Sequence, residues 1–304
     1  MPPPPPPYSQ WQPTCDTLHA HTQVLGKLAA ATAPAEPQLQ HSALLLSARG
    51  WETLPLPAPD GSGSFAVALD LHRHRASVEH SSGEARCVEL TPHRSVGSVT
   101  RELLDAVAAV AGRVEIDPAP QEVSWSVALD EDEEHHAYDP GAVSAYFASA
   151  TQAALALAAF RAPYRGRRTP VNAWWGSFDL AVSLFSGRPA APPSADFIMR
   201  NAMDAQEVAV GWWPGDARHD QPALYAYLHP SVDGFADPAL DAAGGRFDPD
   251  LGEYVLDWRE VCRASDPQAT ALRFMHAVFS HACTSCDWDP QLASSAHGDP
   301  PPVV

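Results

Sequence analysis

The sequence predicts an α+β fold in which antiparallel β-sheet is packed against helices. The strand-like segments follow one another in runs, with helical segments before and after them, and no βαβ rhythm is present. The turn-forming segments GSGS and SSGE separate neighbouring strand-like segments and indicate hairpins. With 304 residues and a hydrophobic content of 45%, the chain can form one compact unit or two fused α+β halves.

The first half of the chain is expected to begin with a helix at residues 16–31, where leucines and a valine recur near helical spacing. Strands are expected at residues 41–49, 65–71, 75–80, 86–90 and 123–129. Between the last two lies an amphipathic helix, which Ser95 caps at its start and Gly112 ends. The acidic run DEDEEHH that follows is expected to be a solvated loop.

The second half opens with Asp139-Pro140, which is typical of a helix start and predicts a long alanine-rich helix to residue 161. Strands are then expected at residues 171–175, 178–185, 207–213, 223–228 and 253–257, and a last helix at residues 267–283. The proline-rich ends, residues 1–10 and 293–304, are expected to be disordered, which leaves residues 11–292 as a single domain.

The charge of the chain restricts its partners. A formal net charge of -18, from 37 acids and 19 bases, repels phosphate, so neither nucleic acid nor an anionic membrane is expected to bind. No run approaches the roughly 18 apolar residues of a membrane span, and the first residues lack the pattern of a signal peptide. We therefore expect a cytoplasmic protein. Its oligomeric state is left open.

The cysteines and histidines do not predict a metal site or a cofactor. Five scattered cysteines form no disulfide framework, and Cys283 and Cys286 make a single C-x-x-C where a structural zinc site commonly needs two. We interpret them as thiols at the end of a helix. His135 and His136, in HHAYD, resemble an adventitious metal trap more than a complete ligand set.

Two aromatic segments carry most of the polar chemistry: VNAWWGSFDLAVSLFSGR at residues 171–188 and QEVAVGWWPGD at residues 206–216. Because residues two apart in a strand share a face, Asp179 lies with Ala181 and Ser183, and Glu207 lies with Ala209 and Gly211. Small neighbours leave space, so the two acids are expected to face one cavity on neighbouring strands. The alternative is that the carboxylates bind backbone amides or Arg188 and that the tryptophans only fill the core.

The segments TPVNAWWGSFDLAVSLFSGR, QEVAVGWWPGD, PALYAYLHPSVDGF, GEYVLDWREV and WDP, taken in order, resemble a bacterial family of uncharacterised proteins, domain-of-unknown-function family 5996. The resemblance runs from Trp11 to about Leu292 and implies no activity. It implies a shared pattern at Trp175, Gly176, Ser177, Phe178, Asp179, Gly187, Arg188, Glu207, Gly211, Pro214, Gly215, Tyr225 and Tyr227. The family pattern has histidine where this chain has Asn172 and Gln206, and arginine where it has Leu184. Amides are poor substitutes for imidazole as metal ligands, but they keep its hydrogen-bonding capacity.

Lys27 is the only lysine in the sequence. The resemblance also places Gly-Lys at this position. A compact ammonium in a chain with 37 acids is expected to be anchored by a carboxylate rather than to act as a nucleophile, and codon bias is the alternative explanation for a single lysine.

The sequence therefore predicts a protein that binds a small polar organic ligand in an aromatic, carboxylate-lined cleft. Asp179 and Glu207 are the candidate catalytic residues; the candidate ligand-binding residues are Lys27, Asn172, Trp175, Arg188, Gln206, Trp213, Tyr225 and Tyr227. The alternatives are a hydrolase in which Asp179 and Glu207 form an acid/base pair, and a structural or interaction protein with no small-molecule site.

Overall fold

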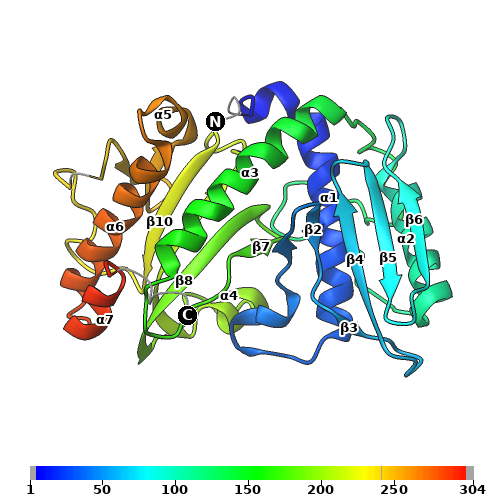
Figure 1. The fold of residues 1–304 in the computed structure, drawn as a ribbon, viewed down its shortest axis with the longest axis horizontal. Helices are drawn as coiled ribbons and strands as arrows, with labels where there is room; N and C mark the ends of the chain where they lie inside the picture. Colours follow the sequence, from blue (N-terminus) through cyan, green and yellow to red (C-terminus); the bar gives the residue numbers. More distant parts are fainter. Residues whose placement is uncertain (1–4, 241, 299–304) are drawn as a thin grey trace, which may run out of the picture. The chain divides into compact units, whose positions relative to one another are not determined.

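The fold contains two antiparallel sheets with helices packed against them, which confirms the predicted α+β class (Figure 1). The structure, a computed structural model, describes residues 5–240 and 242–298. The outermost parts of both expected tails, residues 1–4 and 299–304, lie outside the described residues.

The expected domain divides into two compact units. The N-terminal unit comprises Pro5–Ala148 together with Asn172–Asp179, and the C-terminal unit comprises Ser149–Val171 and the chain from Leu180 onward. One boundary falls within helix α3 (Pro140–Arg161) and another at the start of strand β8 (Asp179–Pro189). The segment WWGSFD is therefore a part of the N-terminal unit that the chain supplies from its second half.

The N-terminal unit is a sheet in the order β1-β2-β4-β5-β6, with β3 paired to β4. Its elements are α1 (Tyr8–Thr32), the 3₁₀ helix η1 (Pro37–Ser42), β1 (Leu45–Leu46), β2 (Gly50–Glu52), β3 (Leu56–Pro57), β4 (Ser64–Asp70), β5 (Arg75–His80), β6 (Ala85–Glu89), α2 (Val96–Ala111), the first part of α3, and β7 (Asn172–Trp174). Helix α2 packs on β4, β5 and β6, and α1 lies beside α2 (Figure 1). The predicted caps of α2 are confirmed: Ser95 accepts a hydrogen bond from the Ser98 amide, and Gly112 has a φ of 96°.

Helix α1 begins at Tyr8, eight residues before the predicted start and inside the expected tail of residues 1–10. It is buried on almost every side from Trp11 to Ala29, including polar residues such as His19 and Gln23. A helix buried all round lacks a polar stripe, so its periodicity could not reveal the first two turns.

Two predicted strands of the N-terminal unit are wrong. The first part of residues 41–49 is occupied by η1, which starts at Pro37, so only β1 remains as strand. Residues 123–129 form no strand, and the Leu129 amide donates to the Pro118 carbonyl instead of to a neighbouring strand.

The C-terminal unit is built on a sheet with strands in the order β11-β12-β10-β9-β8. Its elements are the rest of α3, β8 (Asp179–Pro189, from Leu180), α4 (Phe197–Ala202), β9 (Ala205–Trp213), β10 (Ala223–His229), β11 (Arg246–Asp248), β12 (Glu253–Asp257), α5 (Trp258–Arg263), α6 (Pro267–Ser285) and α7 (Pro290–Ser295). The long strands confirm the predicted ones within a few residues, whereas the short α4, β11, α5 and α7 carry too few residues for a periodic signal.

The two faces of this sheet differ in composition. One face carries Leu180, Val182, Val208, Val210 and Trp212, and α5 and α6 pack on it, with Trp258 of α5 against Trp212. The opposite face carries small, polar and aromatic residues: Ala181, Ser183, Phe185, Glu207, Ala209, Gly211, Trp213, Tyr225, Tyr227 and His229. We call this second surface the small-residue face. The alternation predicted from the sequence is confirmed.

Helix α3 corrects one expectation about the membrane. Within the described chain it is the one helix whose length and composition suffice to cross a bilayer, with a mean hydropathy of 1.4 over 18 residues. Half of that stretch is buried inside the protein, as in a core helix, so the observation is weak evidence for a span.

Candidate functional site

The predicted site residues divide between the two units. Lys27, Asn172, Trp175 and Asp179 belong to the N-terminal unit, and Arg188, Gln206, Glu207, Trp213, Tyr225 and Tyr227 belong to the C-terminal unit. Each group is described with its own unit.

In the N-terminal unit, Trp175 is held by hydrogen bonding and by close packing. Its indole N–H donates to the Ser42 carbonyl at 3.0 Å. Its ring lies so close to Gly26 that a Cβ atom there would come within 2.0 Å of Cδ1. Asn172 is fixed by donating to the Gln40 side chain at 3.0 Å. Both side chains therefore have structural partners within this unit.

Phe178 stands at the centre of an aromatic cluster. Its ring stacks with those of His19, Trp51 and Tyr146 at centroid distances of 4.9, 5.3 and 5.2 Å. Its φ is 56°, an uncommon conformation for a bulky residue, so the surrounding contacts must hold it there. The WGSFD turn is therefore fixed by this packing.

Asp179 follows directly in the chain and is only 4% exposed. Its Oδ1 accepts a hydrogen bond from the Ser177 hydroxyl. Burial, together with the nearby charge of Asp179, raises the pKa of Tyr146 well above its ordinary value. Asp179 thus lies in the interior of the N-terminal unit beside the aromatic cluster.

Lys27 lies over Trp175, with its Nζ 5.5 Å from the ring centroid. The residue is 5% exposed. Burial lowers the pKa of its ammonium, while the charge of Asp117 raises it. A carboxylate does act on the ammonium, since the charge of Asp117 raises its pKa, and the Trp175 ring adds an aromatic face that attracts a cation through its quadrupole.

In the C-terminal unit, Glu207 lies near one end of the small-residue face. Phe185 and His229 oppose it on the two neighbouring strands, and it is 4% exposed. Burial raises its pKa to about 7, although a hydrogen bond with Ser183 and the charge of Arg167 act in the opposite direction. The carboxyl therefore keeps its proton to a higher pH than an exposed glutamate does.

An aromatic row continues from Glu207 along the same face. Tyr225 and Tyr227 stack with parallel rings at 6.3 Å, and Trp213 meets Tyr225 edge-on at 5.4 Å. The Tyr225 ring crosses β9 above Gly211, where a Cβ atom would come within 2.3 Å of Cζ. Tyrosine therefore fills part of the space that the small residues were expected to leave for a ligand.

The expectation that Asp179 and Glu207 face one cavity is wrong. They do lie on adjacent strands, but Glu207 pairs with Phe185, six residues along β8 from Asp179. Six residues of strand span about 20 Å, more than the roughly 10 Å that a two-carboxylate hydrolase allows. The two acids also have different neighbours, Ser177 and Tyr146 in one case and Ser183 and Arg167 in the other.

Two other candidates of the C-terminal unit lie away from Glu207. The Arg188 guanidinium donates to the carbonyls of Cys286 and Asp287, at the end of α6. Gln206 precedes Glu207 in β9, and its side chain therefore points to the opposite face of the sheet. Neither residue joins the small-residue face.

The polar groups around Glu207 include two that the sequence did not reveal. Asp204 and Arg167 act on its pKa through their charges, and Arg167 also covers the Phe185 ring at 3.6 Å. Both come from segments outside the two aromatic motifs, so no local pattern pointed to them. Ser183, in contrast, was already assigned to this face by the alternation of β8.

Among the described residues, no group of three or more His, Cys, Asp or Glu side chains is arranged to hold a metal ion. Cys283 and Cys286 are buried free thiols, and burial raises the pKa of Cys283 to about 12. His135 contacts Asp132 through Nδ1 at 2.7 Å.

A family of unknown function, DUF5996, matches residues 3–295, almost the whole chain. The comparison of this chain with curated proteins and with solved structures found no match.

Proposed function

The chain belongs to the DUF5996 family of unknown function, and on that premise we propose that it binds a small polar organic ligand on the small-residue face of its C-terminal unit. In this proposal Glu207 accepts a hydrogen bond from an amine or hydroxyl group of the ligand. Trp213 and Tyr227, which are both partly exposed, supply the aromatic contacts.

The observation that carries the proposal is that protein partners replace only a part of the hydration that the buried Glu207 carboxylate loses. A buried carboxyl loses the hydration of its charged form, and protein partners normally replace it. Ser183 and Arg167 replace only a part of this stabilisation by water, since the pKa of Glu207 still rises to about 7. A donor on a bound ligand would supply the remainder.

The chemistry of the face favours an amine over other donors. Tyrosine and tryptophan rings beside a carboxylate are the groups that proteins use to bind organic cations. The formal net charge of -18 also draws cations toward the protein. Arg167 lies nearby, so a ligand that carries both an amine and an acceptor group, such as an amino alcohol or amino acid, fits better than a simple cation.

The test is a thermal-shift screen with amines, amino alcohols, amino acids and polyols, carried out at pH 6 and pH 8. A ligand amine binds the ionised carboxylate, so we expect a larger shift at pH 8 than at pH 6. Glu207→Gln keeps the shape of the side chain but removes the charge, and it should weaken binding at least tenfold.

Glu260→Gln is the matched control, because Glu260 is an exposed glutamate that pairs with Arg263. It should bind every compound as the parent does. If no compound distinguishes the parent from Glu207→Gln, the small-residue face is structural and the proposal fails.

A further inference from the structure

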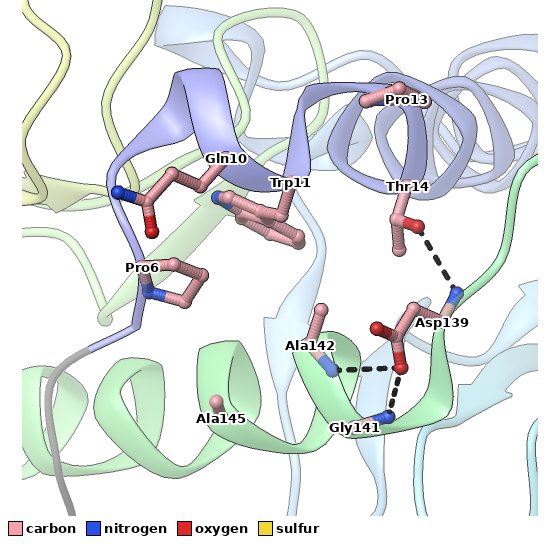
Figure 2. A pocket seen from close by; sticks show the side chains of 9 residues that line it. All are labelled: Pro6, Gln10, Trp11, Pro13, Thr14, Asp139, Gly141, Ala142 and Ala145. Carbon is pink, nitrogen blue, oxygen red and sulfur yellow. Dashed lines mark hydrogen bonds between the residues drawn. The ribbon is translucent and has the colours of Figure 1, made fainter.

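The N-terminal unit contains a pocket of about 420 Å³ between the first turns of α1 and of α3 (Figure 2). Its size lies within the range of roughly 300–1,000 Å³ that is usual for small-molecule sites. The residues that line it are Pro6, Gln10, Trp11, Pro13, Thr14, Asp139, Gly141, Ala142 and Ala145. None of them belongs to the small-residue face, so this site is independent of the function proposed above.

Trp11 supplies the observation that points to a ligand. The residue is 4% exposed, and its buried indole nitrogen has no hydrogen-bond partner among the residues that the structure describes. Buried N–H groups in proteins are nearly always paired, so an orphan donor at a pocket wall needs an acceptor from elsewhere. Figure 2 shows this nitrogen on the side of the ring that faces Gln10 and Pro6, two other residues of the pocket.

Asp139 supplies a second polar group on the opposite wall. Its Oδ1 accepts hydrogen bonds from the backbone amides of Gly141 and Ala142, at 2.7 and 3.3 Å. Its backbone N–H donates to Thr14 Oγ1 at 3.1 Å, which ties α1 to the start of α3. The carboxylate is thus held in place by one oxygen. Among the described residues the other oxygen accepts no hydrogen bond, so it is available to a donor.

The rest of the wall is apolar and made of small side chains. Pro6 and Pro13 come from the α1 side, and Ala142 and Ala145 from α3 (Figure 2). Small, rigid walls of this kind accommodate a flat apolar group better than a charged one.

We propose that this pocket binds a small organic amide: an apolar body, a carbonyl oxygen that accepts from the Trp11 indole, and an N–H that donates to Asp139. The exposed side chain of Gln10 forms the rim. An anionic ligand is disfavoured because Asp139 lines the pocket.

Benzamide is the probe, because it carries a flat ring, an acceptor and a donor. Binding is measured by titration with ligand-observed NMR on the full chain, with aniline as a probe that has the donor but lacks the carbonyl. We expect saturable benzamide binding in the millimolar range or tighter and at least tenfold weaker binding of aniline.

Two variants test the site directly. Trp11→Phe keeps an aromatic ring and removes the N–H, and it should weaken benzamide binding at least tenfold. Ala145→Leu places a larger side chain in the pocket at a helical position that tolerates leucine, and it should abolish binding while the far-UV circular dichroism stays unchanged.

Trp125→Phe is the matched control. Trp125 is another tryptophan of this unit whose buried indole nitrogen has no partner in the described part of the chain, but it does not line the pocket. It should bind benzamide as the parent does. The proposal is overturned if benzamide does not bind saturably, if Trp11→Phe binds within twofold of the parent, or if Ala145→Leu still binds.

Discussion

Asp179 and Glu207 look alike in the sequence but differ in the structure. Each acid lies beside a Trp-Trp pair, is flanked by small residues and ends up 4% exposed. Asp179 sits next to an aromatic cluster that fixes the WGSFD turn, with Ser177 as a local donor. Glu207 lies on a sheet face where burial still outweighs its partners and raises its pKa to about 7.

Two carboxylates with the same exposed fraction therefore have different surroundings. Asp179 lies beside the aromatic rings of the N-terminal unit, whereas Glu207 has two charged neighbours, Arg167 and Asp204, in the C-terminal unit. The WGSFD turn is held by the packing of Phe178, and the carboxyl of Glu207 keeps its proton to a higher pH than an exposed glutamate does.

The strongest test of the structural interpretation is Phe178→Ala. It removes the ring that stacks with His19, Trp51 and Tyr146, and the loss of a buried phenylalanine typically costs about 3–5 kcal/mol of unfolding free energy. Urea denaturation measures the effect. Phe197→Ala is the control: Phe197 is 62% exposed, so its loss should change the stability by less than about 0.5 kcal/mol. A similar small change for Phe178→Ala would mean that the turn does not depend on this cluster.

The second prediction concerns pH. The pKa of Glu207 is raised from 4.5 to about 7 in the folded protein, so the folded state binds the proton more tightly than the unfolded state. The stability that this group contributes is fully present below about pH 4.5 and is lost as the pH rises through about 7. At about 1.4 kcal/mol per pKa unit, the loss is roughly 3 kcal/mol.

The measurement is the unfolding free energy of the parent and of Glu207→Gln at several pH values between 4.5 and 8. The difference between the two proteins removes the effects of the other acids, and it should shift in favour of the variant as the pH rises. A difference that stays constant over this range would show that the carboxyl is not perturbed.

The sequence was sufficient for the fold class and for the faces of the long strands, because both follow from periodicity. Alternation correctly grouped Ser183 with Ala181 in one strand and Glu207 with Gly211 in the other. It could not give the register, and the register decides how far Glu207 lies from Asp179. A shift in the register between two strands moves the paired residues by several ångströms per residue shifted, and the alternation in the sequence of each strand stays the same.

The parts of the site that escaped prediction depend on contacts between distant segments. The pocket beside Trp11 requires α1 to begin at Tyr8 and to meet the start of α3, and nothing in a proline-rich terminus indicates this. Arg167 and Asp204 reach Glu207 from outside its motif. Segments of this kind have no local signature.

The third prediction is that Gly26→Ala destabilises the N-terminal unit by about 1–3 kcal/mol, the usual cost of overpacking. The added methyl group would come within 2.0 Å of the Trp175 ring and force it to move. This loss is expected even though alanine is the better helix former by about 1 kcal/mol. Thermal unfolding compares the variant with Gly298→Ala, where the nearest atom is 3.6 Å away and no effect is expected. Unchanged stability of Gly26→Ala would show that Trp175 can shift without cost.

The smallest expected effect belongs to Lys27. Its ammonium lies 5.5 Å from the Trp175 centroid, and burial lowers its pKa. Lys27→Met keeps the apolar stem and removes the charge, so it loses a cation–π contact of about 0.5–1 kcal/mol but also relieves the burial of a cation. If the aromatic contact holds the ammonium in place, the lost cation–π contact costs more free energy than the removal of the buried charge gives back. We therefore expect Lys27→Met to lower the unfolding free energy by less than about 1 kcal/mol. Lys27→Arg should restore the unfolding free energy in part, because arginine keeps the charge but must fit a larger planar group into a site that is 5% exposed.

Chemical denaturation of the parent and the two variants at pH 7 measures this order of stability. If both variants match the parent, the single lysine is a consequence of codon usage and Lys27 leaves the set of candidate site residues.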